Sequence, residues 1–267
     1  MLRRLLGAST PVGAVAVCVL ITSAVSPASA SISNVIFKVR AESSLGVAEQ
    51  EFYFADGAYG PPGTFNWTLA NSGGFTDLVD PNNNNIIAAL EDASTTIVET
   101  PAPGVPYRVR TGFVLIAGAE DTTFTITSAL LGFATVDAAD AQARTFANIT
   151  LTDGPGGNGS HLDGLADGGN AVYIGHYNGL APLGTLFAGL IGGLTISPGG
   201  GSASASEAQP PVGFTPLGVA VSSLSNGWKF SVTANDNVSG NGTMLILPEP
   251  GTLALVALGL FAALRRR

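Results

Sequence analysis

Apolar and polar side chains alternate with a period of two along much of the interior of this 267-residue chain. In the segment 33–39, for example, Val35, Phe37 and Val39 fall on one side of an extended backbone. A period of two is typical of half-buried β-strands and not of amphipathic helices. The same pattern predicts further strands at residues 50–54, 64–69, 95–99, 107–116, 122–127, 133–136, 145–151, 171–174, 217–221, 227–233 and 242–247.

Turn-forming residues separate these segments. Asn226-Gly227 and Asn241-Gly242 are the strongest hairpin signals, because both dipeptides tolerate positive φ angles. Many short strands with frequent turns and no exact internal repeat predict an all-β protein, a β-sandwich of jelly-roll-like type. Two apolar segments, 86–93 and 183–190, are candidates for short helices, and 137–144 for a helical turn or a loop.

The segment 197–211 has low complexity, with the sequence Ser-Pro-Gly-Gly-Gly-Ser-Ala-Ser-Ala-Ser-Glu-Ala-Gln-Pro-Pro. It is either a flexible surface loop or a linker to a final β-rich piece. About forty residues remain between it and the C-terminal segment, too few for an ordinary independent domain. We therefore expect a flexible loop within one sandwich domain that spans residues 31–247.

The N-terminus has the three zones of a secretory signal. A basic start with Arg3 and Arg4 precedes an apolar stretch over 12–25, and Ala28 and Ala30 supply the small residues that a signal peptidase recognises. The pattern predicts a signal helix within residues 1–30, removed by cleavage after Ala30. The alternative, a membrane anchor, would have a short apolar core for a span of about 20 residues. Cys18, the one cysteine, would leave with the signal, so the mature chain would have neither a disulfide nor a thiolate site.

The C-terminus has three parts in order: Pro248-Glu249-Pro250, an apolar stretch over 252–264, and Arg265-Arg266-Arg267. As a transmembrane helix, the apolar stretch would be about 20 Å long, against a bilayer core of about 30 Å. The arginines would act as a membrane stop on the cytoplasmic side. Because proline fixes φ and lacks an N–H group, we expect 248–250 to be extended and unable to join a regular sheet.

These three parts resemble the PEP-CTERM sorting signal of bacterial surface proteins, over residues 248–267. The resemblance implies handling by an exosortase, with Pro248, Glu249 and Pro250 as recognition residues. It also implies an association with exopolysaccharide and biofilm production. We expect a precursor that transiently spans the inner membrane with the domain outside, is cut near Pro250, and ends at the cell surface or in the extracellular matrix.

Charge limits the partners of the exported region. Residues 31–250 contain six basic and nineteen acidic residues, a formal net charge of −13. Nucleic acid is a poor partner for such a surface, because it requires a basic patch. The acidity fits a protein that is soluble outside the cell, and it is compatible with calcium binding.

Candidate chemistry in the interior is sparse. Ser160, His161 and Asp163 lie close together in sequence and His176 follows, but no Gly-x-Ser-x-Gly elbow accompanies them. We interpret both histidines as polar loop residues and expect no catalytic residues. The glycine-rich stretch 153–170 offers hard oxygen ligands for a calcium site, although its spacing matches no known calcium loop and a solvated loop is the alternative. The candidate calcium ligands are Asp153, Asn158, Asp163 and Asp167.

Two tryptophans, Trp67 and Trp228, sit in strand-like alternation, where a core position is more usual than an exposed sugar-binding one. The two end signals, together with the lack of a convergent catalytic set, favour a non-enzymatic surface or matrix protein of structural or adhesive type. A polysaccharide-binding module is the alternative, and a secreted polysaccharide-active enzyme is a third.

Overall fold

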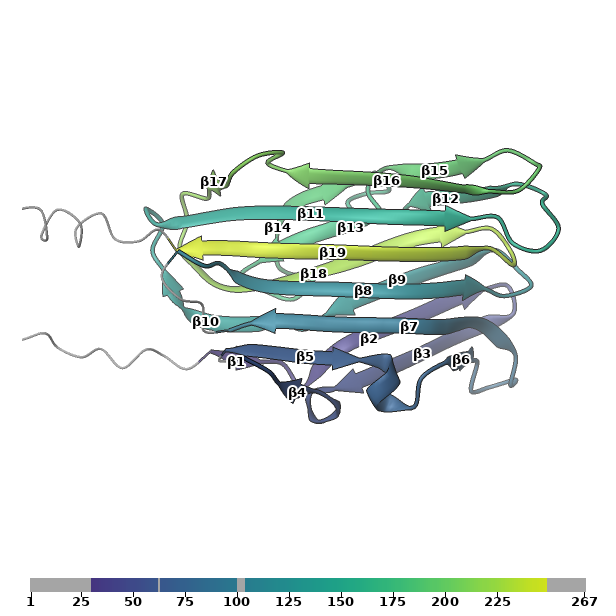
Figure 1. The fold of residues 1–267 in the computed structure, drawn as a ribbon, viewed down its shortest axis with the longest axis horizontal. Coiled ribbons are helices and arrows are strands. Elements are labelled where there is room, and N and C mark those ends of the chain that lie inside the picture. The colour runs from purple at the N-terminus through teal and green to yellow at the C-terminus, as the bar shows by residue number, and fades with distance from the viewer. Residues whose placement is uncertain (1–29, 62, 100–103, 249–267) are drawn as a thin grey trace, which may run out of the picture.

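The protein is described by a computed structural model that places residues 30–61, 63–99 and 104–248. Two antiparallel sheets face each other, and the long strands run along the long axis of the molecule (Figure 1). The described residues contain two short 3-10 helices, η1 (Phe54–Asp56) and η2 (Leu69–Ser72). The prediction of an all-β, sandwich-like fold is therefore confirmed, while the jelly-roll arrangement stays a prediction.

The first sheet has ten strands, and its central path runs β1-β10-β18-β9-β2-β3. The smaller strands β12 and β13 pair with β18, and they carry β15 and β14 on their outer edges. The strands of this sheet are β1 (Ser31–Ile32), β2 (Val35–Ser43), β3 (Gly46–Tyr53), β9 (Thr122–Ser128), β10 (Leu131–Val136), β12 (Ser160–Gly164), β13 (Tyr173–Tyr177), β14 (Thr185–Leu190), β15 (Gly193–Ile196) and β18 (Val221–Val232).

The second sheet has nine strands in the order β16-β11-β19-β8-β7-β5-β4, with β17 beside β11 and β6 beside β7. Its centre consists of four long strands, β11, β19, β8 and β7, which lie side by side in Figure 1. The strands of this sheet are β4 (Ala58–Tyr59), β5 (Thr64–Thr68), β6 (Thr76–Val79), β7 (Ile86–Val98), β8 (Tyr107–Ala117), β11 (Ala141–Thr152), β16 (Ser202–Gln209), β17 (Thr215–Pro216) and β19 (Asn237–Pro248).

One large apolar core fills the space between the sheets. Trp67 and Trp228 are each 1% exposed, so their expected place in the core is confirmed. Trp67 contacts the rings of Phe37 and Phe52, and Trp228 forms an edge-to-face pair with Tyr173 at 4.8 Å between ring centres. Burial of each such ring contributes on the order of 2–3 kcal/mol, and this makes the core the main source of stability.

Several local expectations are wrong. The segment 86–93 lies in β7 and most of 183–190 lies in β14, so neither forms the expected helix. A short apolar run fits a buried strand as well as a helix, and here pairing with neighbouring strands decides the outcome. The expected turn or loop at 137–144 is found at residues 137–140, whereas 141–144 belong to β11. The strand expected at 217–221 is wrong, because residues 217–220 connect β17 to β18.

The segment 197–211, expected to be a flexible loop, contains strand β16. All eight residues of β16 pair with Thr145–Thr152 of β11. Alternating serine and alanine have little intrinsic preference for a strand, but the neighbouring long strand supplies a complete hydrogen-bonding partner. Both hairpin signals are also wrong, because Asn226-Gly227 and Asn241-Gly242 lie inside β18 and β19.

Candidate functional site

The end of the sandwich from which the C-terminal segment leaves is the first candidate site. Strand β19 ends at Pro248, and β1 begins at Ser31, directly after the predicted cleavage position; both lie at the same end of the molecule (Figure 1). Pro248 pairs with Ala141 of β11, so the expectation that it cannot join a sheet is wrong. A proline that ends a strand still offers its carbonyl, and only its missing N–H is lost to the ladder.

The rest of both end signals lies outside the described residues. This applies to Ala28 and the signal helix, and to Glu249, Pro250, the apolar stretch 252–264 and Arg265, Arg266 and Arg267. Within residues 30–61, 63–99 and 104–248, no helix is long and apolar enough to span a bilayer. Cleavage after Ala30 and the membrane-stop role of the arginines stay predictions.

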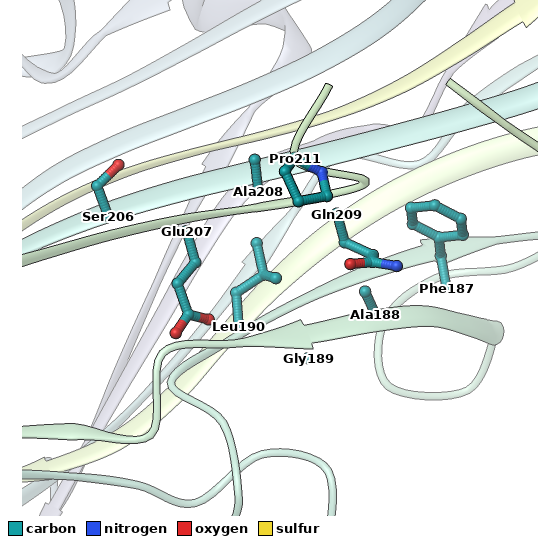
Figure 2. Close-up of a pocket in the computed structure, with 9 residues that line it drawn as sticks. All are labelled: Phe187, Ala188, Gly189, Leu190, Ser206, Glu207, Ala208, Gln209 and Pro211. Atoms are coloured by element: carbon teal, nitrogen blue, oxygen red, sulfur yellow. The ribbon is translucent and has the colours of Figure 1, made fainter. Parts of the chain in front are cut away.

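An open groove of about 710 Å³ is the second candidate site, and it lies between the edge strands β14 and β16 (Figure 2). Glu207 reaches into it from β16, and its Oε2 atom accepts a hydrogen bond of 2.7 Å from the backbone N–H of Ile191. Gln209 and Phe187 both line the groove, and in Figure 2 their side chains are seen toward the same end of it. An amide, a carboxylate and an aromatic ring together can hydrogen-bond and stack against a polar ring-shaped ligand.

Sequence patterns do not reveal this groove, because they favour a helix for one of its walls and a flexible loop for the other. The alternation of Ser202, Ser204 and Ser206 with Ala203 and Ala205 was the signal that could have identified β16 as a strand. No local pattern could show that β14 and β16, which belong to different sheets, face each other.

His176 lies on β13 and not in a loop, and it is 3% exposed. It lines a small cavity of about 280 Å³ together with Asp167, Ile174 and Leu186. Neither ring nitrogen has a hydrogen-bond partner among the placed residues, although the Gly184 backbone lies nearby. Burial lowers the pKa of His176, and the Gly184 backbone and the Asp167 carboxylate oppose this change. The lowered pKa favours the neutral form of the ring.

His161 is exposed on β12 and is not a loop residue either. Its Nε2 atom lies 3.0 Å from Asp163 Oδ1, and its Nδ1 atom lies 2.9 Å from Thr195 Oγ1. Ser160 is buried, and its hydroxyl accepts a hydrogen bond of 3.5 Å from Thr233 Oγ1. The side chains of Ser160 and His161 thus have different partners, although the His161 backbone N–H also donates a hydrogen bond of 2.8 Å to Thr233 Oγ1.

The four candidate calcium ligands occupy different settings. Asp153 Oδ2 accepts a hydrogen bond of 3.2 Å from Gly159 N–H, Asn158 is exposed, and Asp163 is paired with His161. Asp167 lies in a turn with a left-handed φ of 47°. In the part of the chain that the structure describes, no three His, Cys, Asp or Glu side chains form a group that could hold a metal ion. The calcium interpretation stays a prediction.

Comparison with known proteins identifies the C-terminal segment. Residues 247–267 match the family described as the PEP-CTERM protein-sorting motif, which starts one residue before the expected boundary. No curated protein matches the chain in sequence.

Two solved structures, both of infectious bursal disease virus (the Gx and Gt strains), show weak similarity at 11% identity. Each covers 82% of this chain, with TM-scores of 0.23 and 0.16, and the chain spans 62% and 66% of their lengths. These scores do not establish a shared fold. The identification rests on the C-terminal match: the chain carries a PEP-CTERM sorting motif, which implies an exported, membrane-anchored precursor that is sorted by an exosortase.

Proposed function

We propose that the protein is a non-enzymatic component of the cell surface or extracellular matrix, of structural or adhesive type, associated with exopolysaccharide and biofilm. The observation that carries the proposal is the sorting motif at residues 247–267, which overlaps the end of β19. Because the motif continues directly from the last strand of the sandwich, the whole domain is sorted with it.

The open edge of the second sheet supports an adhesive role. Strand β16 pairs with β11 on one side, and its residues Ser202–Ser206 carry no charge and no proline. Edge strands of soluble proteins usually carry charged residues or proline, because an edge without them can pair with another chain. An edge of this kind suits a protein whose role is association.

A complementation experiment in the native host tests the proposal. We expect loss of the protein to weaken cell cohesion and matrix retention, and the unaltered chain to restore both. A chain in which Pro248, Glu249 and Pro250 are replaced by alanine should be exported, retain residues 252–267 by intact mass, and fail to restore cohesion. Pro155→Ala, at an exposed proline in the segment that follows β11, is the matched control and should behave as the unaltered chain.

Two results would contradict this function. One is full cohesion in cells that lack the protein. The other is robust turnover of polysaccharide, ester or peptide substrates by the purified protein at a rate that depends on its concentration.

The groove between β14 and β16 favours a second candidate, a binding module for extracellular polysaccharide. Phe187→Ala and Gln209→Ala should then each weaken binding to the host polysaccharide by about tenfold, because each removes one stacking or hydrogen-bonding contact. Leu183→Ala, which alters a 92% exposed side chain on the adjoining loop, should leave binding unchanged. Equal affinity of all three variants would exclude the groove as the site.

A polysaccharide-active enzyme is the weaker alternative. Glycoside hydrolysis generally uses two carboxylates that flank the bond to be broken. Among the described residues that line the groove, Glu207 is the one carboxylate.

A further inference from the structure

Three of the six basic residues of the exported region lie together on the outer face of the second sheet. Arg108 and Arg144 lie opposite Leu245 of β19, one on β8 and the other on β11. Neighbouring strands are about 4.8 Å apart, so the two arginine Cα atoms are about 10 Å apart. Arg110 follows Arg108 by two residues on the same face and lies opposite Thr243.

The surroundings of these arginines are uncharged. The residues beside the arginines on the neighbouring strands are Val98 and Leu245 in line with Arg108 and Arg144, and Thr96, Thr243 and Phe146 in line with Arg110. The alternate residues on these strands, such as Val109 and Met244, point into the core, which confirms that the arginines point outward.

No carboxylate pairs with any of the three within the described residues, whereas Lys38 and Arg40 on the other sheet each have a glutamate partner. Because residues 31–250 carry a net charge of −13, three cations without a carboxylate partner among the placed residues are unexpected.

Polar atoms in the cluster are left without partners. Arg108 Nε, Arg144 Nε and Thr243 Oγ1 are all buried and make no hydrogen bond to any placed residue. Thr243 is only 1% exposed although it lies on the outer face. Buried donors of this kind are normally satisfied, so their grouping points to a missing acceptor.

The remaining contacts position the guanidinium groups without neutralising them. Arg110 Nε donates to Asn241 Oδ1 at 2.9 Å, and Arg144 Nη2 donates to the carbonyl of Pro211 at 3.1 Å. Both acceptors are neutral. Burial and the neighbouring Arg110 lower the pKa of Arg108, a sign that its environment lacks an anion. An arginine nonetheless stays charged in proteins, so the cluster keeps its positive field.

We infer that Arg108, Arg110, Arg144 and Thr243 form a binding site for a phosphate group. One bidentate arginine satisfies a carboxylate, whereas three guanidinium groups and a hydroxyl match the greater charge and the additional acceptor atoms of a phosphate dianion. Leu245, which lies between Arg108 and Arg144, precedes Pro248 by three residues. The two arginines are therefore near the end of the sandwich where the chain passes into the sorting motif (Figure 1). A lipid headgroup at the membrane surface and a soluble phosphate are both within reach of that position.

Binding of inorganic phosphate tests the site directly. The full chain, purified in an uncharged detergent, is measured by equilibrium dialysis with labelled phosphate, against chloride at equal ionic strength. We expect saturable binding that weakens at least tenfold when Arg108→Gln and Arg144→Gln are combined. The pair Arg40→Gln with Lys229→Gln removes the same charge from the outer face of the first sheet and should change the affinity less than twofold.

Equal weakening in both pairs would show that net charge alone attracts phosphate, and this would overturn the site, as would the absence of saturable binding. Thermal unfolding of each variant establishes that it is folded. If the double variant does not fold, Arg110→Gln, at an exposed position, replaces it, with a several-fold loss expected. This assay does not depend on sorting, so the phosphate site and the proposed function can fail separately.

Arginine modification by phenylglyoxal distinguishes the two sources of phosphate. The full chain is placed in nanodiscs of phospholipid or of a phosphate-free glycolipid, and the modified arginines are mapped by mass spectrometry. Protection of Arg108 and Arg144 in phospholipid discs alone assigns the site to a lipid headgroup, and protection that requires added inorganic phosphate assigns it to a soluble phosphate. Protection under neither condition, or stronger protection by a phosphate-free polyuronate, would overturn the phosphate assignment.

Discussion

Gly242 faces Tyr173 and Trp228 of the first sheet across the core, and its replacement by alanine gives a sharp test of the packing. It is buried in the middle of β19, between strands β8 and β11. A Cβ atom at this position would lie 2.3 Å from Tyr173 Cε2 and 2.7 Å from Trp228 Cζ2. Both distances are far below van der Waals contact, so at least one ring would have to move.

Neither ring is free to move. The Tyr173 hydroxyl is hydrogen-bonded to Thr145 Oγ1 at 2.9 Å, and Trp228 Nε1 donates to Thr111 Oγ1 at 3.3 Å. The two rings also pack edge to face against each other. Overpacking of a core by one methyl group costs about 1–3 kcal/mol, and constrained neighbours place Gly242→Ala in the upper half of that range. For a domain of this size, about 2–3 kcal/mol lowers the thermal midpoint by roughly 4–12 °C.

Thermal and urea unfolding of the purified chain, followed by near-UV circular dichroism of the buried rings, would measure this effect. Gly192→Ala is the matched control, because its φ is not left-handed and the nearest atom to an added Cβ is 3.9 Å away. It should leave stability unchanged or raise it by up to about 1 kcal/mol through a less flexible unfolded chain. A Gly242→Ala midpoint equal to that of Gly192→Ala would refute the packing argument.

Three further predictions concern charge. Burial lowers the pKa of His176 below its ordinary value of 6.5. The neutral ring therefore makes its whole contribution to the free energy of unfolding above about pH 6.5, and this contribution falls as the pH drops from there to the folded pKa. Urea unfolding across this range should show the decrease, and His176→Leu should lack it. Hydrogen bonds from the backbone N–H groups of Asn82 and Val47 lower the pKa of Asp80. Its carboxylate therefore stabilises the fold above its ordinary pKa of 3.8, and this effect is lost as the pH falls through the folded pKa. Asp80→Ala should lower the thermal midpoint at neutral pH and make stability less sensitive to acid. The calcium interpretation predicts a higher midpoint in millimolar calcium than in chelator, abolished by Asp153→Asn, and identical melting curves would end it.

The all-β class could be predicted because most long strands carry a complete alternating pattern. Strand β9, for example, has apolar Phe124 and Ile126 on the core side and Thr123, Thr125 and Thr127 on the other. Such a strand is recognised without knowledge of its neighbours, because its own residues record which side is buried. The short edge strands β4, β6 and β15 have too few residues for such a pattern and are not predicted. Strand β16 is longer, but its small serine and alanine side chains make its alternation weak.

The two Asn-Gly dipeptides show why local turn chemistry can mislead. Asn226 is buried in β18, where Thr111 Oγ1 donates to its Oδ1 and its Nδ2 donates to the Val109 carbonyl. Gly227 lets Ala181 of the covering loop approach, since an added Cβ would lie 3.1 Å from the Ala181 Cβ atom. Both residues thus serve contacts with residues more than forty positions away in the sequence, and neither forms a turn. A local pattern cannot distinguish a glycine required by packing from one required by a turn.

The candidate sites were harder to predict than the fold, because they join residues from separate strands. Arg108 and Arg110 are close in sequence, but Arg144 joins them only because β19 runs between β8 and β11. Charge counting showed that the six basic residues could not form a patch that outweighs the acidic surface. It could not show that three of them would share one face without a carboxylate partner.

The place at which the sorting motif joins the sandwich has a physical consequence for processing. Strand β19 pairs with β11 and β8 on its two sides, and the motif begins at its last residues. A cut near Pro250 would therefore remove no part of any strand among the described residues, and the ladders that hold β19 would stay complete. A motif attached to an edge strand would transmit a pull from the membrane to one ladder, whereas here two ladders share it. The domain can thus be held through its C-terminal segment before processing and remain folded after it.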